Sequence, residues 1–436
     1  MPPNGGDSTE HDETRTGSTI AGSSRRSYLK AATAIGATGL AGCLGSLTGG
    51  GPIKVGMAFP YTGPYGASAE KQRDGVDLAV QEINDDGGLL GRDLETYDRD
   101  TELNPDVNAR RIRELLHEEN VDLLVANLSG GITTQTQSLA KDAEVPYMAA
   151  SRTSPPFHYP DSLGEGSYAP APLNIEAIVS PLKGAFDQEL GNSFYAVIAD
   201  YGFNRPEAWE FTQQYIEERG GELKGSVFTP LGNTDFSSAI TDAMDSGADV
   251  LLGMIYGLDF SNFMQQAGEF GLRDEMEIMN PVQSQSFLEI AGDPAIWEDV
   301  YFGMSWHPVL MTEDSQAETF ATKFNDEFGY YGESFGAIAY TGMKELARAV
   351  SESGGLSTGD IAGALDGSTF DSYFMEGETE WRDCDNQAIN PGYLFTKGKS
   401  ADAMGERGAW DIVELLTVFD SSEFLPDCSY FEEQQG

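Results

Sequence analysis

The sequence is poor in positively charged residues. Its 436 residues include 26 Lys and Arg against 71 Asp and Glu, which gives a formal net charge of -45. Because nucleic-acid binding commonly rests on a basic surface, this deficit excludes such a role, and we expect no DNA or RNA partner. The acidic residues are spread over the whole chain. Carboxylates repel one another less at molar salt, where the Debye length falls to about 3 Å, so the composition predicts a protein of a halophilic archaeon.

Histidine and the motifs of common enzymes are also scarce. The four histidines have no partner at metal-ligand spacing, and the chain lacks H-E-x-x-H, C-x-x-C, G-x-S-x-G and Walker A patterns. Hydroxyl side chains occur without an accompanying histidine that could activate them. We therefore expect no catalytic residue, no metal and no cofactor.

No apolar run reaches the roughly 20 residues that a membrane-spanning helix needs. Residues 1–22 are polar, Arg25 and Arg26 follow, and the twelve uncharged residues 31–42 end at Cys43. This order predicts a twin-arginine-type signal peptide over residues 1–42 and a lipidated Cys43 that begins a tether over residues 43–51. The chain would then be extracytoplasmic and anchored to the outer face of the cell membrane. A disordered tail with a chance Arg-Arg pair is the alternative.

Three cysteines are present, and two remain once Cys43 is assigned to lipid. Disulfides persist outside the cytoplasm, so Cys384 and Cys428 are predicted to be bridged and to tie down the C-terminal tail. Two free buried thiols are the competing interpretation, because the sequence does not reveal the distance between them.

The length suits two domains, and apolar runs alternate with segments of helical period. Such alternation predicts an α/β fold with parallel sheets. Asn104 and Pro105 form a typical helix start, and further helices are expected over residues 75–84, 314–328 and 334–352. The predicted strands cover residues 53–59, 94–97, 121–125, 145–149, 194–199, 223–228, 250–255 and 277–279.

Small and polar residues follow four of these strands. Residues 129–134, with a helix expected from about Thr133, come after one strand, and residues 151–154, 200–202 and 256–259 come after three others. Ligands of open α/β sheets bind outside the carboxyl ends of the strands, so these loops are expected to line one pocket. The small residues at 129–131 let the backbone approach a ligand, and free N–H groups there favour a carboxylate.

The chain resembles the type 1 periplasmic binding proteins of the leucine/isoleucine/valine-binding and amide-binding group. The resemblance runs from about residue 53 to residue 395, and its most specific part is the segment 75–84 followed by Gly87, Gly88 and Gly91. Other matching residues are Gly56, Tyr61-Thr62-Gly63 and Asp98.

This resemblance implies two Rossmann-like lobes joined by a three-segment hinge. They would close on a solute and then dock on the permease of an ABC importer. The expected lobes are residues 52–171 plus 304–372 and residues 172–303 plus 373–436. The solute would be a branched-chain amino acid or a similar molecule. Urea, short amides, a small aromatic or carboxylic acid, and a ligand-sensor role remain alternatives.

Site residues follow from the same resemblance. The loop 129–133 and Thr153 match positions that hold an amino-acid carboxylate, and Ser151 matches a carbonyl that receives the ammonium. Where amino-acid binders place an acidic residue, this chain has Pro281-Val282. Asp259 could replace that carboxylate, or the ligand lacks an amine, and Arg152 would suit an extra carboxylate. The candidate ligand-binding residues are Tyr61, Tyr65, Ser129, Gly130, Gly131, Thr133, Ser151, Arg152, Thr153, Tyr201, Tyr256 and Asp259.

Overall fold

The computed structural model describes residues 50–171, 174–200, 204, 207–290, 293–405 and 409–433. The predicted signal peptide, the twin arginines, Cys43 and the candidate ligand residue Tyr201 lie outside the described residues. Within the described part of the chain, no helix combines the length and apolar character of a bilayer span.

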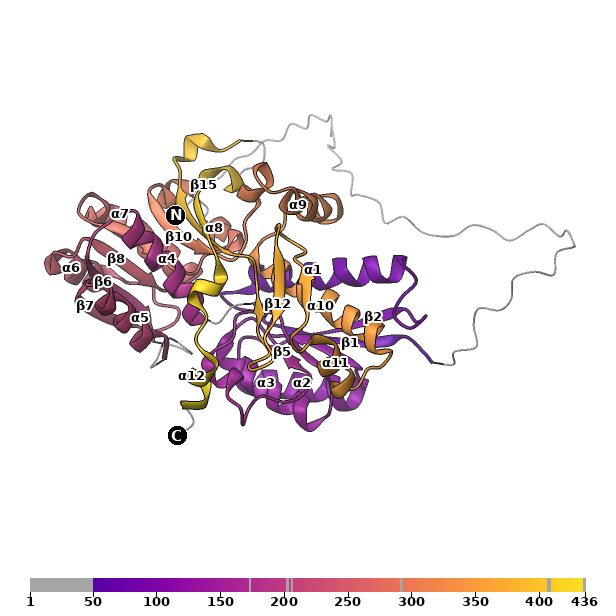
Figure 1. The fold of residues 1–436 in the computed structure, drawn as a ribbon. Coiled ribbons are helices and arrows are strands. Elements are labelled where there is room, and N and C mark those ends of the chain that lie inside the picture. Colours follow the sequence, from indigo (N-terminus) through magenta and orange to yellow (C-terminus); the bar gives the residue numbers. More distant parts are fainter. Residues whose placement is uncertain are drawn as a thin grey trace, which may run out of the picture. The chain divides into compact units, whose positions relative to one another are not determined.

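The first sheet has five strands in the order β2-β1-β3-β4-β5, and every neighbouring pair is parallel. α2 and α3 pack together on one side of it, whereas α1 and α10 pack together on the other (Figure 1). Asn104 caps α2 by accepting from two backbone N–H groups, and Pro105 occupies the first helical position, as predicted. The strands are β1 (Ile53–Phe59), β2 (Leu94–Asp100), β3 (Leu123–Ala126), β4 (Tyr147–Ala149) and β5 (Ser167–Tyr168). The helices are α1 (Gly66–Asp85), α2 (Pro105–Glu114), α3 (Gly130–Asp142), α9 (Ser315–Phe328), α10 (Ser334–Ser353) and α11 (Thr358–Leu365).

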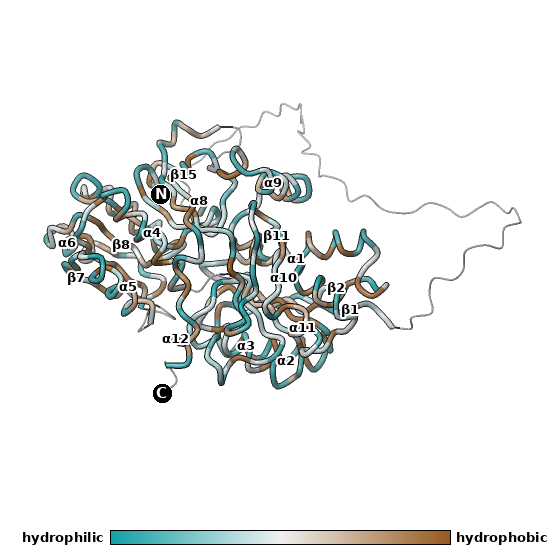
Figure 2. Tube along the Cα trace, in the orientation of Figure 1, coloured by the Kyte–Doolittle hydropathy of each residue, from teal (hydrophilic) through white to brown (hydrophobic). Residues whose placement is uncertain are grey.

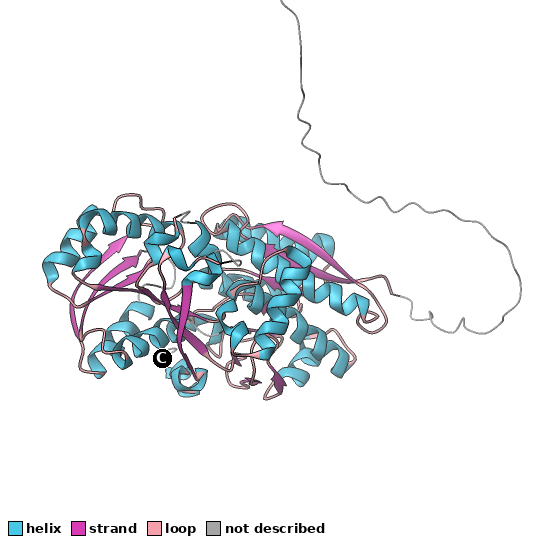
Figure 3. Ribbon diagram, turned by 90° about the horizontal axis from the view of Figure 1, so that it is seen from above, coloured by secondary structure: helices cyan, strands magenta, loops and turns pink. Residues whose placement is uncertain are grey.

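The second sheet has seven strands in the order β15-β14-β10-β9-β8-β6-β7. The five strands from β10 to β7 are parallel, as predicted, but β14 and β15 form an antiparallel edge. Helices flank the strands of both sheets (Figure 3). The strands are β6 (Ser193–Ala199), β7 (Glu222–Thr229), β8 (Val250–Met254), β9 (Glu277–Asn280), β10 (Val300–Met304), β14 (Tyr393–Gly398) and β15 (Val413–Phe419). The helices are α4 (Asn174–Asp187), α5 (Glu207–Glu218), α6 (Ser237–Ser246), α7 (Leu258–Phe270) and α8 (Gln285–Ile290).

Buried apolar strands form the cores. All five residues of β8 and of β10 are buried, and so are the last six of β6. The central strands are accordingly brown in Figure 2, whereas the outward faces of the helices are largely teal. This contrast is the expected result of burying one face of each helix against a sheet that is covered on both sides.

Up to β14 the chain passes between the two lobes three times, after β5, after β10 and before β14, and its C-terminal tail returns to the first lobe once more. A small antiparallel sheet of β11 (Thr369–Asp371), β12 (Glu378–Trp381) and β13 (Ala388–Ile389) adjoins the first lobe. Trp381 packs edge-on against Tyr168 with 5.4 Å between ring centres, and Ala169 pairs with Gln387. Residues 378–389 therefore contact the first lobe, whereas the sequence assigns them to the second.

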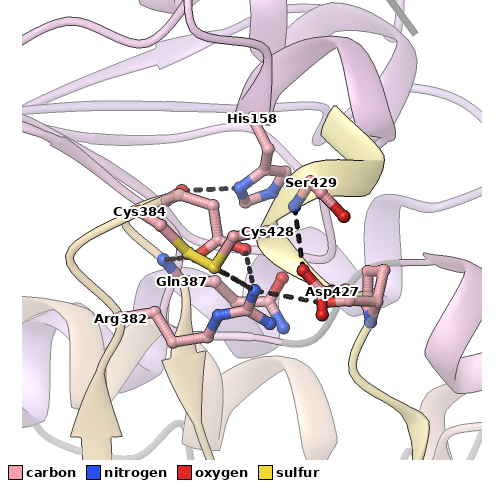
Figure 4. Close-up of a disulfide and its surroundings, with 9 residues drawn as sticks. His158, Arg382, Cys384, Gln387, Asp427, Cys428 and Ser429 are labelled. Atoms are coloured by element: carbon pink, nitrogen blue, oxygen red, sulfur yellow. Dashed lines mark hydrogen bonds and ion pairs between the residues drawn. A yellow bond between two sulfur atoms is a disulfide. The ribbon is translucent and has the colours of Figure 1, made fainter. Parts of the chain in front are cut away.

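The C-terminal tail, residues 425–433, leads back to the first lobe. Just before it, Phe424 packs against Tyr393 and Phe419 of the second sheet. Cys428 then forms a disulfide with Cys384, which lies between β12 and β13, the pairing that the sequence predicts (Figure 4). The tail ends in α12 (Cys428–Glu433), where the ring of Phe431 lies 5.5 Å from that of His158. A short covalent strap thus joins the last strand of the second lobe to the first lobe.

Candidate ligand-binding site

A network of amides holds the loop after β3 in shape. Asn127 has a φ of 74°, a left-handed conformation that asparagine tolerates better than most residues. Its side chain donates to Asn108 at 3.0 Å and accepts from the Tyr147 hydroxyl at 2.6 Å, while its carbonyl accepts from Gln72 at 3.0 Å. All four side chains are buried, so the loop presents a fixed backbone to the residues that follow.

Helix α3 starts at Gly130, three residues earlier than the sequence predicts. Ser129 is extended and precedes the helix, and the first four N–H groups of any α-helix have no partner inside it. Ser129 and Gly130 both line a cavity. The positive end of the helix dipole lies at this point, where it favours an anion.

Arg152 follows β4 and lines the same cavity. Its side chain is buried, with 3% of the residue exposed, and its Nη2 donates to the Ser305 hydroxyl at 2.6 Å. Burial lowers the pKa of Arg152, because loss of water disfavours the cation. A guanidinium titrates at so high a pH that it nevertheless keeps its charge near neutrality.

The remaining walls of the cavity are apolar and largely aromatic. Tyr65 and Phe287 lie 5.7 Å apart between ring centres, and Phe287 and Phe335 lie 5.9 Å apart. The cavity encloses about 440 Å³ of empty space, a volume that includes the solvent at its mouth. Its lining comes from both lobes and comprises Tyr65, Leu128, Ser129, Gly130, Ser151, Arg152, Tyr256, Val282, Phe287 and Phe335.

Six of the predicted site residues therefore meet in this cavity: Tyr65, Ser129, Gly130, Ser151, Arg152 and Tyr256. Tyr201 is not described. Gly131 lies in the first turn of α3 but does not line the cavity, and the Thr133 hydroxyl donates to the Gly130 carbonyl at 2.7 Å. The early helix start explains this placement, because it turns Thr133 into the buried side of α3.

Three other predicted site residues do not line the cavity, and their side chains form hydrogen bonds with other parts of the protein. The Tyr61 hydroxyl donates to Asp98 at 2.7 Å, and the Thr153 hydroxyl lies 2.6 Å from Nε2 of His158. Asp259, only 3% exposed, accepts from the Gly232 N–H at 2.9 Å. Its carboxylate thus holds the loop after β7. Asp259 does not line the cavity, so it does not replace the acidic residue that amino-acid binders have at the position of Val282.

Sequence reasoning missed Leu128, Phe287 and Phe335 as lining residues and noted Val282 only as a departure. Leu128 follows β3 directly and could have been inferred from its place beside Ser129. Phe287 lies in α8 and Phe335 in α10, and only the tertiary fold brings these helix starts to the cavity.

Comparison with known proteins identifies the class of molecule. The family described as "Periplasmic binding protein" matches residues 52–402. The chain belongs to this family. Members of the periplasmic binding protein family bind small-molecule solutes outside the cytoplasm and work with the permeases of ABC transporters; they are not enzymes.

Among relatives of this periplasmic binding protein is the Leu/Ile/Val-binding protein homolog 7 of Brucella abortus. It is 23% identical over 378 residues, which cover 84% of this chain and 91% of the relative. A substrate-binding protein of a chemotactic signal transduction system in Halobacterium salinarum is 38% identical over 109 residues, which cover 24% of this chain and 26% of the relative.

Solved structures share the two-lobed α/β fold. An amino acid ABC transporter substrate-binding protein from Pseudomonas fluorescens superposes with a TM-score of 0.77 at 22% identity, covering 87% of this chain and 98% of that one. A Streptococcus pneumoniae branched-chain amino acid binding protein solved with isoleucine has a TM-score of 0.71 at 18% identity, over 84% of this chain and 99% of that one. A Rhodopseudomonas palustris protein solved with 3,4-dihydroxybenzoic acid has a TM-score of 0.71 at 17% identity, over 85% of this chain and 98% of that one.

Proposed function

We propose that this chain is an exported lipoprotein that captures a small carboxylate-bearing solute and delivers it to the permease of an ABC importer. Membership of the periplasmic binding protein family supports capture and delivery. The observation that carries the choice of solute is the cavity, whose lining includes the start of α3 and the positively charged residue Arg152. Both favour a negative charge on the ligand.

The solutes of two structural relatives support this choice. Isoleucine and 3,4-dihydroxybenzoic acid, found in the Streptococcus and Rhodopseudomonas proteins, differ in shape, yet each carries a carboxylate. We propose that the ligand here is an amino acid or a similar small acid, and that the two lobes trap it by closing about the three connecting segments.

A thermal-shift screen of the purified protein in molar KCl tests the proposed function. Binding raises stability by RT ln(1 + [L]/Kd), about 2.7 kcal/mol at a ligand concentration of 100 Kd. We expect a rise in melting temperature with members of a panel of amino acids and small carboxylic acids. If every member of the panel leaves the melting temperature unchanged, the proposed class of solute is wrong.

The proposed anchor rests on the segment that ends at Cys43. We expect the wild-type protein to be recovered with cell membranes, because a lipid on this cysteine would hold it there. Cys43→Ser would then release the protein to the soluble fraction or stop its processing. A membrane-bound Cys43→Ser protein would contradict the anchor without affecting the proposed binding role.

The Halobacterium match supports a second candidate, a binding protein that reports to a chemotaxis transducer. Both roles require the same ligand-filled cleft, and they differ only in the partner. Deletion of the gene should abolish uptake of the solute if the chain serves an importer. It should abolish only the swimming response if the chain serves a transducer.

A further inference from the structure

Arg152 is a buried cation without a carboxylate partner in the described part of the chain. No acidic oxygen there lies within 4.0 Å of its guanidinium, and its Nε has no hydrogen-bond acceptor. The Nη2 bond to Ser305 and a contact of 5.9 Å with the ring of Phe335 are neutral. Since an unpaired buried charge is strongly destabilising, the cavity requires an anion to complete it.

Against the effect of burial, the charge of Glu333 acts on Arg152 and raises the pKa of the guanidinium, but Glu333 and Asp259 are each hydrogen-bonded to other groups. Glu333 accepts from the Phe335 N–H at 3.0 Å and from Ser286 at 3.4 Å, which holds it at the start of α10. Its burial raises its pKa to about 7, so its charge is only partial near neutrality. Asp259 is bonded to Gly232 on another loop. Neither residue belongs to the cavity lining.

The rest of the lining offers no negative charge to an ammonium group. Among the described lining residues none is acidic, and the position where the resemblance predicts an acid is Val282, which is 8% exposed. Leu128 and the rings of Phe287 and Phe335 belong to the same lining. An ammonium placed against these side chains would lose water without gaining a negatively charged partner, and Arg152 would add repulsion.

We propose that the ligand is an amine-free carboxylate with an apolar or aromatic body. Its carboxylate pairs with Arg152 and the N–H group of Gly130 at the start of α3, and Val282 excludes the ammonium of an ordinary amino acid. This inference rests on the proposed function and narrows its solute class. It makes Arg152 the residue that selects for the acid and Val282 the residue that selects against the amine.

Calorimetric titration with matched pairs of solutes tests the inference on the purified chain in molar KCl. The pairs are isoleucine and its des-amino acid, phenylalanine and its des-amino acid, and benzoate and benzamide. We expect the amine-free acid of each pair to bind at least about ten-fold more tightly than its partner. Tighter binding of the amino acids or of benzamide would overturn the inference while leaving the proposed function intact. A panel without any binding would overturn both.

Two variants test whether Arg152 and Val282 determine the preference for an amine-free acid. Arg152→Gln should weaken binding of the best acid by about a hundred-fold, whereas Arg110→Gln, a change at an exposed arginine outside the cavity, should leave it unchanged. Val282→Asp should reverse the preference within the isoleucine pair, because the new carboxylate meets the ammonium and repels a bare acid. If Arg152→Gln fails to fold, the Val282→Asp result decides, and an unchanged preference there would overturn the inference.

Discussion

At the scale of single residues, Thr153 shows how a hydroxyl near a ligand pocket can be a structural group. The pKa of His158 is lowered to about 4 by burial, so its ring is neutral at pH 7. Its Nδ1 faces the carbonyl of Asp385 and must donate to it, which leaves Nε2 to accept the proton of Thr153. Thr153 therefore supports the loop that carries Arg152.

Thr153→Val should lower the stability of the ligand-free protein by about 1–3 kcal/mol, because it leaves a buried ring nitrogen without a donor. Thr241→Val, which removes an exposed hydroxyl bonded to its own helix, is the control and should change stability little. Thermal melting of both variants without ligand gives the comparison. If Thr153→Val leaves the melting temperature unchanged but weakens solute binding, Thr153 contacts the ligand instead.

Glu176 is a buried carboxyl beside two of the three connecting segments. It accepts from Gln387 at 3.0 Å and from the Tyr393 hydroxyl at 3.3 Å, and Asp385 and Arg382 are the charged groups that face it. Burial raises its pKa from 4.5 to about 8, with a further contribution from Asp385. The folded protein thus retains a proton that the unfolded chain releases above pH 4.5.

Because the folded state binds more protons in this window, the stability that Glu176 contributes is fully present below pH 4.5 and is lost as the pH rises to about 8. Glu176→Gln keeps a neutral side chain of similar shape at every pH. The variant should therefore gain stability relative to wild type between pH 5 and pH 8, measured by denaturant unfolding at constant salt. A constant difference across that range would mean that Glu176 stays ionised in the fold.

At the scale of elements, the packing of α1 against α10 depends on a residue without a side chain. A Cβ at Gly75 would lie 2.3 Å from the carbonyl oxygen of Gly336, which is backbone and cannot move aside cheaply. Gly75→Ala should cost at least about 1–3 kcal/mol of stability for this reason. Gly363→Ala in α11, where nothing lies within 4 Å, should instead gain up to about 1 kcal/mol. Denaturant melts of both variants check the contrast, and equal effects would contradict it.

Elements with long apolar runs could be predicted from the sequence, and short ones could not. β1 and the start of α2 agree with the prediction because their signals are local: seven mostly apolar residues in one, an Asn-Pro pair in the other. β5 has only two residues, Ser167–Tyr168, and so carries no pattern of its own. The prediction omits β10, although this strand has an apolar run, Val300–Met304.

The same division holds for the site. Lining residues at the ends of strands, such as Ser129, Ser151 and Tyr256, could be predicted because parallel strands place their carboxyl ends along one edge. Phe335 could not, since it reaches the cavity only after the chain has passed between the lobes. The sequence also could not reveal that Arg152 has no salt-bridge partner among the described residues, because this depends on which side chains the folded chain places around it.

At the scale of the whole molecule, the charge of -45 should make stability depend on salt. Repulsion among carboxylates opposes the compact state, and salt screens it. The melting temperature should rise from low salt to molar KCl. Replacing KCl with an equally concentrated neutral solute such as glucose separates screening from solute exclusion. An equal rise with glucose would show that screening is not the cause.

The strap formed by the tail determines which proteolytic cuts divide the chain into two separate fragments. The Cys384–Cys428 bond closes a ring that contains the third connecting segment together with β14 and β15. A protease that cuts once inside this ring opens it without dividing the molecule, whereas a cut at either of the other two connections yields two separate pieces. Non-reducing electrophoresis of the nicked protein would show one band for a cut in the ring, which a reductant would resolve into two. Of the three links between the lobes, this one alone has a covalent duplicate in the described part of the chain.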